Sequence, residues 1–251
     1  MATEMPAVRN TAAVLRHLAT SSRPVPASAL ARHIGIPRSS TYQLLKVLID
    51  EGLVVRIPES HSYGLGVGAF ELGSAYLRSS PLQHLAQPLL ARLVSASSHT
   101  AQLGILHGSE TMYLLKEQPQ VPTTLVTGVG VRIPAHLTAS GRAMLALLPR
   151  QQVLAIFSSA RQFVDRTGVG ARNLRELQAQ LAEDRHRGWA IERGAVTEGV
   201  TTIAAAATDH GGRPAASIGV SFHSDAVPDS GYERLAAQVR KAADDLSIRL
   251  R

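Results

Sequence analysis

The stretch Ala27–Glu51, ASALARHIGIPRSSTYQLLKVLIDE, determines how the rest of the chain is interpreted. It predicts two short helices separated by Gly35, because glycine tolerates the positive φ that a helix C-cap often adopts. Pro37 then opens the second helix, where its missing N–H costs nothing. Apolar positions recur at helical spacing and predict one buried side on each helix. They are Leu30, Ala31 and Ile34 in the first helix and Thr41, Leu44, Leu45 and Leu48 in the second.

The opposite side of the second helix carries polar side chains that suit DNA. No acidic residue occurs before Asp50, and groups that hydrogen-bond phosphates and base edges dominate. A recognition helix in a major groove requires such a face. From the two helices alone, a helical hairpin with an incidentally polar outer face is the alternative. The predicted DNA contacts, one of them in the preceding helix, are Ser28, Arg38, Ser39, Ser40, Tyr42, Gln43 and Lys46.

The following segment favours DNA binding. Two β-prone runs, 53–57 and 63–65, flank a polar turn and predict a hairpin. Directly after a recognition helix, such a hairpin is a wing that places Arg56 and His61 against the DNA backbone or minor groove. Residues 5–66 are therefore predicted to form a winged helix-turn-helix domain.

Length and composition allow two globular domains. The 251 residues are 45% hydrophobic and 18% charged, as in a folded protein with two cores. A net charge of +7 favours a polyanionic partner, and residues 1–66 carry seven basic against four acidic side chains. Cysteine is absent, which excludes disulfides and thiolate sites. With no signal-peptide pattern and no apolar run near ~20 residues, we expect a cytoplasmic protein without a membrane partner.

The remaining chain predicts a linker and a second domain. Residues 67–80 are expected to contain a linker helix whose aromatic residues, Phe70 and Tyr76, contact a second subunit or pack on their own domain. Residues 81–251 interleave strands and helices without a steady βα rhythm, so the fold class is α/β (α+β) with a largely antiparallel sheet. Strands are expected at 101–107, 110–117, 123–127, 189–191, 201–207 and 214–222.

Capping residues mark the later helices. Asn173 and Glu176 predict a capping box for a helix closed by Gly188, and Ser230 with Glu233 predict another for the last helix. Further helices are expected at 7–20, 82–95 and 138–148. The side chains expected to point inward are Val8, Ala12, Leu15 and Leu18 in the first helix and Tyr232, Leu235, Val239 and Leu246 in the last.

A candidate ligand site lies in the segment 136–143, HLTASGRA. A helix that begins with small residues exposes its first amides, which attract anions together with the helix dipole. Gly141 in the first turn permits the close approach of a ligand or of another backbone. Plain packing of small residues against a sheet is the alternative.

Enzyme signatures are missing from the sequence. It contains no GxSxG elbow, HExxH helix or Walker loop, and its ten histidines lack metal-ligand spacing. Residues 64–69 fit GxGxxG/A, but no acid follows between Glu71 and Glu110, where a dinucleotide site needs one about twenty residues on. We expect no enzyme, cofactor or metal. A small-molecule-processing enzyme and a DNA-independent interaction module remain as alternatives.

Several separated motifs occur in one order along the chain: IGIPRSSTYQLLKVLIDEGLV, YGLG, RIPAHLTASGRAMLALLP, LAEDRHRGWAI, EGVTTIAAAA and AASIGVSF. Together they resemble the IclR family of bacterial transcription regulators. The resemblance implies a winged helix-turn-helix, a linker helix and a GAF-like effector domain. It further implies a homodimer or homotetramer that binds double-stranded operator DNA and a small-molecule metabolite effector, such as an organic or aromatic acid. Repression of a catabolic operon is implied, with an activator of the same architecture as the alternative.

The resemblance also implies an effector pocket. At three positions, however, the residues of this chain bear on how far the family pattern applies. Gln43 stands where arginine is usual, which weakens a phosphate contact and favours adenine. Gly219 stands where a polar side chain is frequent and is expected to leave more room or one fewer hydrogen bond. Glu192 would repel a carboxylate unless protonated, so we expect it to accept from a hydroxyl, amine or hydrazide. The implied effector-binding residues are Leu125, Ile133, Ala139, Ser140, Glu192, Thr202, Gly219 and Ser221, to which the helix start at 136–143 adds Gly141.

Overall fold

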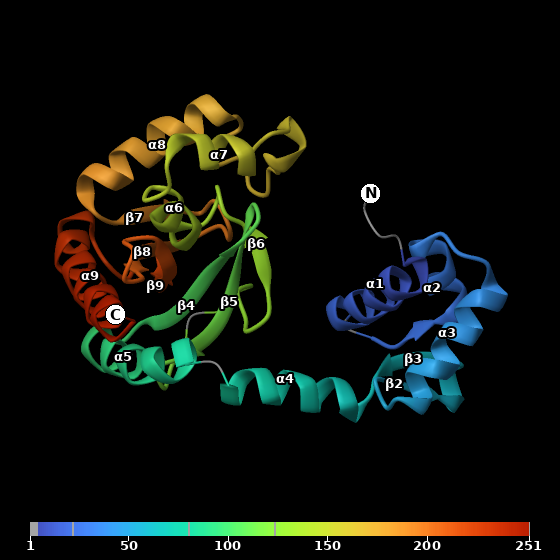
Figure 1. Cartoon of the computed structure of the whole chain (residues 1–251). Helices are drawn as coiled ribbons and strands as arrows, with labels where there is room; N and C mark the ends of the chain where they lie inside the picture. Colours follow the sequence, from blue (N-terminus) through green and yellow to red (C-terminus); the bar gives the residue numbers. More distant parts are fainter. Residues whose placement is uncertain (1–4, 22, 80, 123, 251) are drawn as a thin grey trace. The chain divides into compact units, whose positions relative to one another are not determined.

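The structure is a computed structural model that describes residues 5–21, 23–79, 81–122 and 124–250, without the side chains of residues 74 and 76–79. Residue 80, where the predicted linker ends, residue 123, where a predicted strand starts, and the side chain of Tyr76 lie outside this description. The chain divides into two compact units, Met1–Ser80 and Pro81–Arg251 (Figure 1).

The first unit packs helices around a small antiparallel sheet. The helices are α1 (Pro6–Thr20), α2 (Ala27–Ile34) and α3 (Arg38–Asp50), and the sheet order is β1-β3-β2, from β1 (Val25–Pro26), β2 (Val54–Ile57) and β3 (Ser62–Leu65). Gly35 caps α2 with a φ of 76°, and Pro37 is the N-cap of α3, which confirms the predicted turn between the two helices. The core of the unit contains Val14, Leu18, Val25, Ala27, Leu30, Leu45, Leu48, Val54 and Tyr63.

Two features of this unit differ from the sequence-based prediction. Val8 is 61% exposed, whereas Val14 is fully buried. The reason is that Val8 lies about 120° round the helix from Val14 and so misses the buried face. The short strand β1 was not anticipated, because two residues carry no periodicity; it pairs with β3 and closes the sheet beside the wing.

Glycines let the chain leave the wing by passing close to the turn after α3. A Cβ added to Gly66 would lie 2.3 Å from the carbonyl oxygen of Gly52, so no other residue fits there without a shift. The amide of Gly66 donates to the carbonyl of Leu53 at 2.9 Å, and the amide of Gly68 donates to Gly52 at the same distance. Gly66 and Gly68, within the run 64–69 that fits GxGxxG/A, therefore seat the start of α4 (Val67–Ser79) on the first unit.

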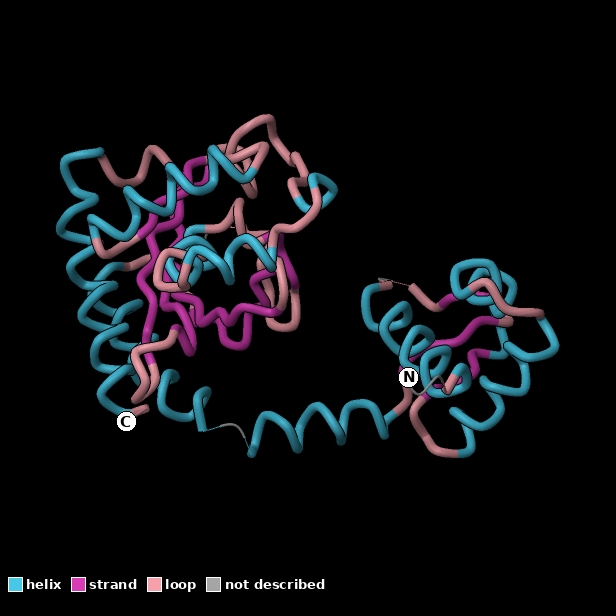
Figure 2. The backbone as a smooth tube through the Cα atoms, turned by 45° about the horizontal axis from the view of Figure 1, so that its top comes forward, coloured by secondary structure: helices cyan, strands magenta, loops and turns pink. Residues whose placement is uncertain are grey.

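The second unit is built on a sheet, drawn magenta in Figure 2. The sheet has six strands in the order β6-β5-β4-β9-β8-β7, and all neighbouring strands are antiparallel. This confirms the predicted largely antiparallel sheet. Its strands are β4 (Thr100–His107), β5 (Glu110–Glu117), β6 (Arg132–Pro134), β7 (Ala190–Arg193), β8 (Val200–Thr208) and β9 (Pro214–His223). Its helices are α5 (Pro81–Ser97), α6 (Ala139–Leu145), α7 (Arg150–Ile156), α8 (Leu174–Arg187) and α9 (Tyr232–Arg249).

Helices cover both faces of this sheet, with α5 and α9 on one face and α6 to α8 on the other (Figure 1). Successive side chains of a strand point to opposite faces. Leu103, Ile203 and Val220 accordingly pack into the core with α5 and α9. Their neighbours Thr202 and Ser221 are equally buried but polar, and they lie on the α6 face. The sheet therefore has one apolar face and one polar face, and both are buried.

Several predicted element boundaries in this unit are wrong. Residues 124–127 form no strand, and α6 ends at Leu145, so Pro149 does not stop that helix but caps α7 instead. The last helix begins at Tyr232 after the N-cap Gly231, without a side-chain cap. Ser230 lies in a 3-10 turn over Asp229–Gly231 that runs directly into α9, so it lacks the extended backbone of an N-cap.

The cap at Asn173 is confirmed in part. Its side chain accepts a hydrogen bond from the amide of Glu176 at 3.0 Å, but the carboxylate of Glu176 reaches the amide of Arg172 rather than that of Asn173. Gly188 closes α8 with a φ of 75°, as expected. The predicted inward face of α9 is also confirmed, with Tyr232, Leu235, Val239 and Leu246 all buried. Among the described residues, no helix combines the length and apolar character needed to cross a bilayer.

Candidate functional site

The outer face of α3 is largely polar from Arg38 to Lys46, and Val47 and Ile49 are exposed only near the end of the helix. Thr41, Leu45 and Leu48 are buried and anchor the helix, whereas Tyr42 is 56% exposed. The exposed face lacks acidic side chains until Asp50 at the end of the helix. It can therefore approach phosphates and base edges without electrostatic repulsion. The predicted contacts that it exposes are Arg38, Ser39, Ser40, Tyr42, Gln43 and Lys46.

The wing adds two further predicted contacts beside this helix. Arg56 is exposed on β2, and His61 is exposed in the turn between β2 and β3, where its φ of 47° produces a tight reversal. Ser28, the remaining predicted contact, is half-buried near the start of α2. The first unit therefore combines a recognition helix and a wing, which is the arrangement of DNA-binding winged helix-turn-helix domains.

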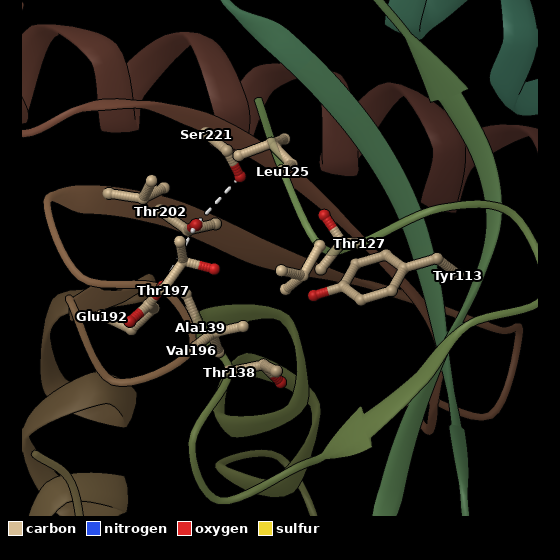
Figure 3. A pocket seen from close by; sticks show the side chains of 12 residues that line it. Tyr113, Leu125, Thr127, Thr138, Ala139, Glu192, Val196, Thr197, Thr202 and Ser221 are labelled. Carbon is tan, nitrogen blue, oxygen red and sulfur yellow. Dashed lines mark hydrogen bonds between the residues drawn. The ribbon is translucent and has the colours of Figure 1, made fainter. Parts of the chain in front are cut away.

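A buried pocket lies in the second unit between the polar face of the sheet and α6 (Figure 3). Its free volume is about 10 Å³, which is room for about one water molecule. Hydroxyl groups and aliphatic side chains dominate its wall, and Glu192 is its single carboxylate. The lining residues are Tyr113, Leu125, Val126, Thr127, Thr138, Ala139, Glu192, Val196, Thr197, Val200, Thr202 and Ser221.

Glu192 sits on β7 and is only 3% exposed. Its Oε2 accepts a hydrogen bond from the amide of Ala195 at 2.8 Å. Burial raises the pKa of its carboxyl to about 7, against hydrogen bonds from Ala195, Val196 and Thr202 and the charge of Arg142, which lower it. A carboxyl with this pKa exchanges its proton near neutral pH.

Tyr113 projects its hydroxyl into the pocket from β5 (Figure 3). Burial raises the pKa of this phenol strongly, so it remains a neutral hydrogen-bonding group. The pocket therefore offers many hydroxyl groups that can donate or accept, and no side chain that carries a permanent charge.

The structure brings five of the nine predicted effector-binding residues together in this pocket: Leu125, Ala139, Glu192, Thr202 and Ser221. Ile133, Ser140, Gly141 and Gly219 do not line it. A Cβ at Gly219 would lie 3.2 Å from both Ser140 Oγ and the Cβ of Ala204. Of the two expectations for Gly219, more room for a ligand is wrong, because Ser140 of α6 and Ala204 of β8 fill that space.

Gly141 serves packing rather than a ligand. A Cβ there would lie 2.4 Å from the carbonyl oxygen of Ala135, so the close approach is that of another backbone. The amide of Gly141 donates to Thr138 Oγ1 at 2.9 Å. This amide is therefore not available to the anion that the sequence suggested for the segment 136–143.

Models of two protein-family domains match the chain. A family model described as the C-terminal domain of the bacterial transcriptional regulator IclR matches residues 74–248, and the IclR helix-turn-helix model matches residues 7–58. The chain belongs to the IclR family. Members of this family are transcriptional regulators rather than enzymes, and the helix-turn-helix of the chain is its DNA-binding module.

Curated relatives of this IclR-family chain are repressors. The transcriptional repressor IclR of Escherichia coli is 27% identical over 239 residues, covering 94% of the chain and 86% of the relative. The repressor AllR of Klebsiella pneumoniae is 27% identical over 240 residues, covering 95% and 87%.

Solved structures share the fold. An IclR regulator from Alicyclobacillus acidocaldarius has a TM-score of 0.84 at 20% identity, with 98% of the chain and 99% of that structure covered. An IclR homologue from Microbacterium hydrocarbonoxydans, solved with 4-hydroxybenzoate, has a TM-score of 0.81 at 21% identity, covering 97% and 98%.

Sequence reasoning missed several residues around the IclR-family pocket. Thr138 could have been found as the N-cap of α6, since threonine before a run of small residues is a capping signal. Tyr113 lies on β5 within a run of four apolar residues, and nothing in the sequence distinguishes it from a core residue. Thr127 and Thr197 lie in loops, whose course no periodicity predicts.

Arg142 was also missed, as the buried cation behind the pocket. Its Nε lies 3.0 Å from Asp184 Oδ2, its Nη1 donates to Gln180 at 3.2 Å, and its Nη2 donates to the carbonyl of Ile191. These contacts engage all three guanidinium nitrogens, and Arg142 does not line the pocket. The pocket therefore lacks a cationic side chain.

Proposed function

We propose that this IclR-family protein is a transcriptional repressor whose operator affinity is controlled by a small molecule bound in the pocket of the second unit. The observation that carries the proposal is the exposed polar face of α3, with Leu45 and Leu48 anchored beneath it. Two repressors of similar sequence support the direction of regulation. We place the protein in the bacterial cytoplasm, where its operator lies.

The proposed repressor acts as a homodimer or homotetramer. Support comes from α4, which exposes three large apolar side chains: Val67 at 69%, Phe70 at 74% and Leu72 at 64%. Val67 and Phe70 share one side of the helix and Leu72 lies on the other, and exposed apolar side chains of this kind fit a contact with a second copy. Paired recognition helices would then read two half-sites about 34 Å apart, one turn of DNA.

Regulation follows from linkage between the two sites. An effector that prefers one dimer geometry changes the match to the half-site spacing and thereby the operator affinity. A coupling of about 1–3 kcal/mol corresponds to roughly 5–150-fold in affinity. The relative solved with 4-hydroxybenzoate supports a small organic effector, and with it the control of a catabolic operon.

The direct test is binding of the full chain to the DNA upstream of its own gene across a salt series. Because phosphate contacts release counterions, the expected affinity falls steeply with salt and exceeds that for unrelated duplexes by at least about a thousandfold. A reporter driven by that promoter should be silenced. Duplex affinity that does not respond to salt would contradict the proposal, and activation of the reporter would favour the alternative regulator.

A further inference from the structure

A row of buried polar side chains crosses the sheet beneath the pocket. It runs from Glu192 on β7 through Thr202 on β8 and Ser221 on β9 to Gln102 on β4, and it ends at Thr127 in the loop before β6. The successive distances are 3.5 Å from Glu192 Oε1 to Thr202 Oγ1, 2.9 Å to Ser221 Oγ, 3.4 Å to Gln102 Oε1, and 2.5 Å from Gln102 Nε2 to Thr127 Oγ1. All five residues are buried.

The hydrogen bonds of this row have one direction. Gln102 Nε2 also lies 3.4 Å from the carbonyl oxygen of Thr127, which can only accept. The amide oxygen of Gln102 therefore faces Ser221, and the Ser221 hydroxyl must donate to it. Since a hydroxyl has a single proton, Ser221 can only accept from Thr202, and the proton of Thr202 is used in turn.

In this direction, the row supplies no hydroxyl proton to the carboxyl of Glu192. Thr202 can donate to Glu192 Oε1, 3.5 Å away, only by withdrawing its proton from the shorter contact of 2.9 Å with Ser221, so in this direction a further donor comes from the protonated carboxyl itself or from a ligand. If Thr202 donated to Glu192 while Ser221 still donated to Gln102, two hydroxyl oxygens 2.9 Å apart would face each other without a proton. If Ser221 also reversed, the oxygen of Gln102, a residue only 1% exposed, would lose its donor.

The ionisable groups around Glu192 do not supply a hydrogen-bond donor to its Oε1. Arg142 on α6 lowers the pKa of Glu192 from behind the pocket, but its guanidinium is bound to Asp184 and to the carbonyl of Ile191. Tyr113 on β5 faces the carboxyl as a neutral phenol. On its own side, the carboxyl of Glu192 accepts from the amides of Ala195, at Oε2, and of Val196, and its Oε1 lies toward Thr202.

We propose that the pocket recognises its effector through an N–H or O–H donor directed at Glu192 Oε1, as in an amide, amidine or amine, and rejects a carboxylate at that point. This inference rests on the proposed function, because it names the chemistry of the effector site. A ligand donor completes the row in its observed direction, whereas a carboxylate adds an acceptor where no cation lines the pocket. A cationic donor binds the ionised carboxyl, so the proton of Glu192 is released to solvent.

Two matched probe sets test this with the full chain by titration calorimetry: benzoate, benzamide and benzamidinium, and their methyl analogues acetate, acetamide and acetamidinium. In at least one set, the amide or amidinium is expected to bind at least roughly tenfold tighter than the carboxylate. Repeating the amidinium titration near pH 7 in buffers of different ionisation enthalpy should reveal proton release.

Variants assign the effect to Glu192. Glu192→Gln preserves the shape but cannot ionise, so it should abolish proton release and weaken amidinium binding by at least roughly tenfold. Thr202→Val should weaken amide binding by interrupting the row. Glu198→Gln, which changes an exposed carboxylate on the loop between β7 and β8, is the control and should leave both unchanged.

Tighter binding of the carboxylates, binding of none of the six probes, or amidinium binding that ignores Glu192→Gln would each overturn the proposal. The same preparations are tested for salt-dependent binding to the promoter duplex. Loss of DNA binding with the probe ranking intact refutes the regulator alone, whereas a carboxylate preference with DNA binding intact refutes only the pocket chemistry.

Discussion

Arg142 Nε lies 3.0 Å from Asp184 Oδ2, and the two side chains are only 8% and 1% exposed. Burial raises the pKa of Asp184 even though Arg142 and Arg187 lower it, so desolvation outweighs the attraction of both cations. The pair therefore costs free energy to bury and positions Arg142 against the carbonyl of Ile191, one residue before Glu192.

Asp184→Ala should destabilise the second unit by about 3–5 kcal/mol, because the charge of Arg142 is then buried without a partner. Urea denaturation of the full chain, followed by near-UV circular dichroism, measures this loss. The double variant Arg142→Met/Asp184→Leu removes both charges and should recover most of it. A single variant as stable as the wild type would show that the pair is solvated.

Stability should depend on pH through Glu192. Its pKa is raised from 4.5 to about 7, so between these values the folded state retains a proton that the unfolded state has lost. Stability contributed by the protonated carboxyl is therefore complete below pH 4.5 and falls as the pH rises to about 7, by up to about 3 kcal/mol. The free energy of unfolding is measured across this range for the wild type and for Glu192→Gln.

The difference between these two proteins isolates the carboxyl from other titrating groups. It should slope between pH 4.5 and 7 and be flat above. Glu198→Gln is the matched control and should follow the wild type. A constant difference across the range would mean that Glu192 titrates like an exposed carboxyl.

Lys46 and Gln43 should contribute to DNA binding in different ways. Lys46→Ala is expected to weaken binding to all duplexes alike and to reduce the salt slope by about 1, because it removes a phosphate contact. Gln43→Ala should relax the preference at particular base pairs, by about 1–3 kcal/mol. Competition binding with a randomised operator library distinguishes the two, and Arg175→Ala, an exposed position on α8, is the control. Uniform losses for both variants would remove the base-reading role of Gln43.

Gly66→Ala should destabilise the first unit by about 1–3 kcal/mol, because its new methyl group would meet the Gly52 carbonyl at 2.3 Å. Gly64 offers a matched control on the same hairpin, since an added Cβ would meet only a Val55 side-chain carbon at 3.9 Å. Thermal unfolding should therefore show a lower midpoint for Gly66→Ala than for Gly64→Ala. Equal midpoints would indicate that the turn at Gly52 shifts to accommodate the methyl group without loss of stability.

Local sequence signals predicted the first unit well and the pocket only in part. Gly35, Pro37 and the apolar spacing of α3 are local features, so the two helices and the exposed face followed from them. The pocket instead joins Tyr113, Thr127 and Glu192, which are distant in the chain and meet only through strand register and the course of a loop. Gly141 and Gly219 show the limit most clearly, because a glycine beside a ligand and a glycine beneath a helix look the same in a sequence.

The contact between the first turn of α4 and Gly52 determines how a movement of the helix would affect the first unit. The helix has 13 residues, so it is about 20 Å long, and its first turn is fixed to the body that carries α3. In the proposed regulator, such a helix would act as a rigid lever. A small rotation at its C-terminal end would reorient α3 without bending α4. In the proposed regulator, a bulky residue at position 66 would loosen that pivot and so uncouple effector binding from DNA binding.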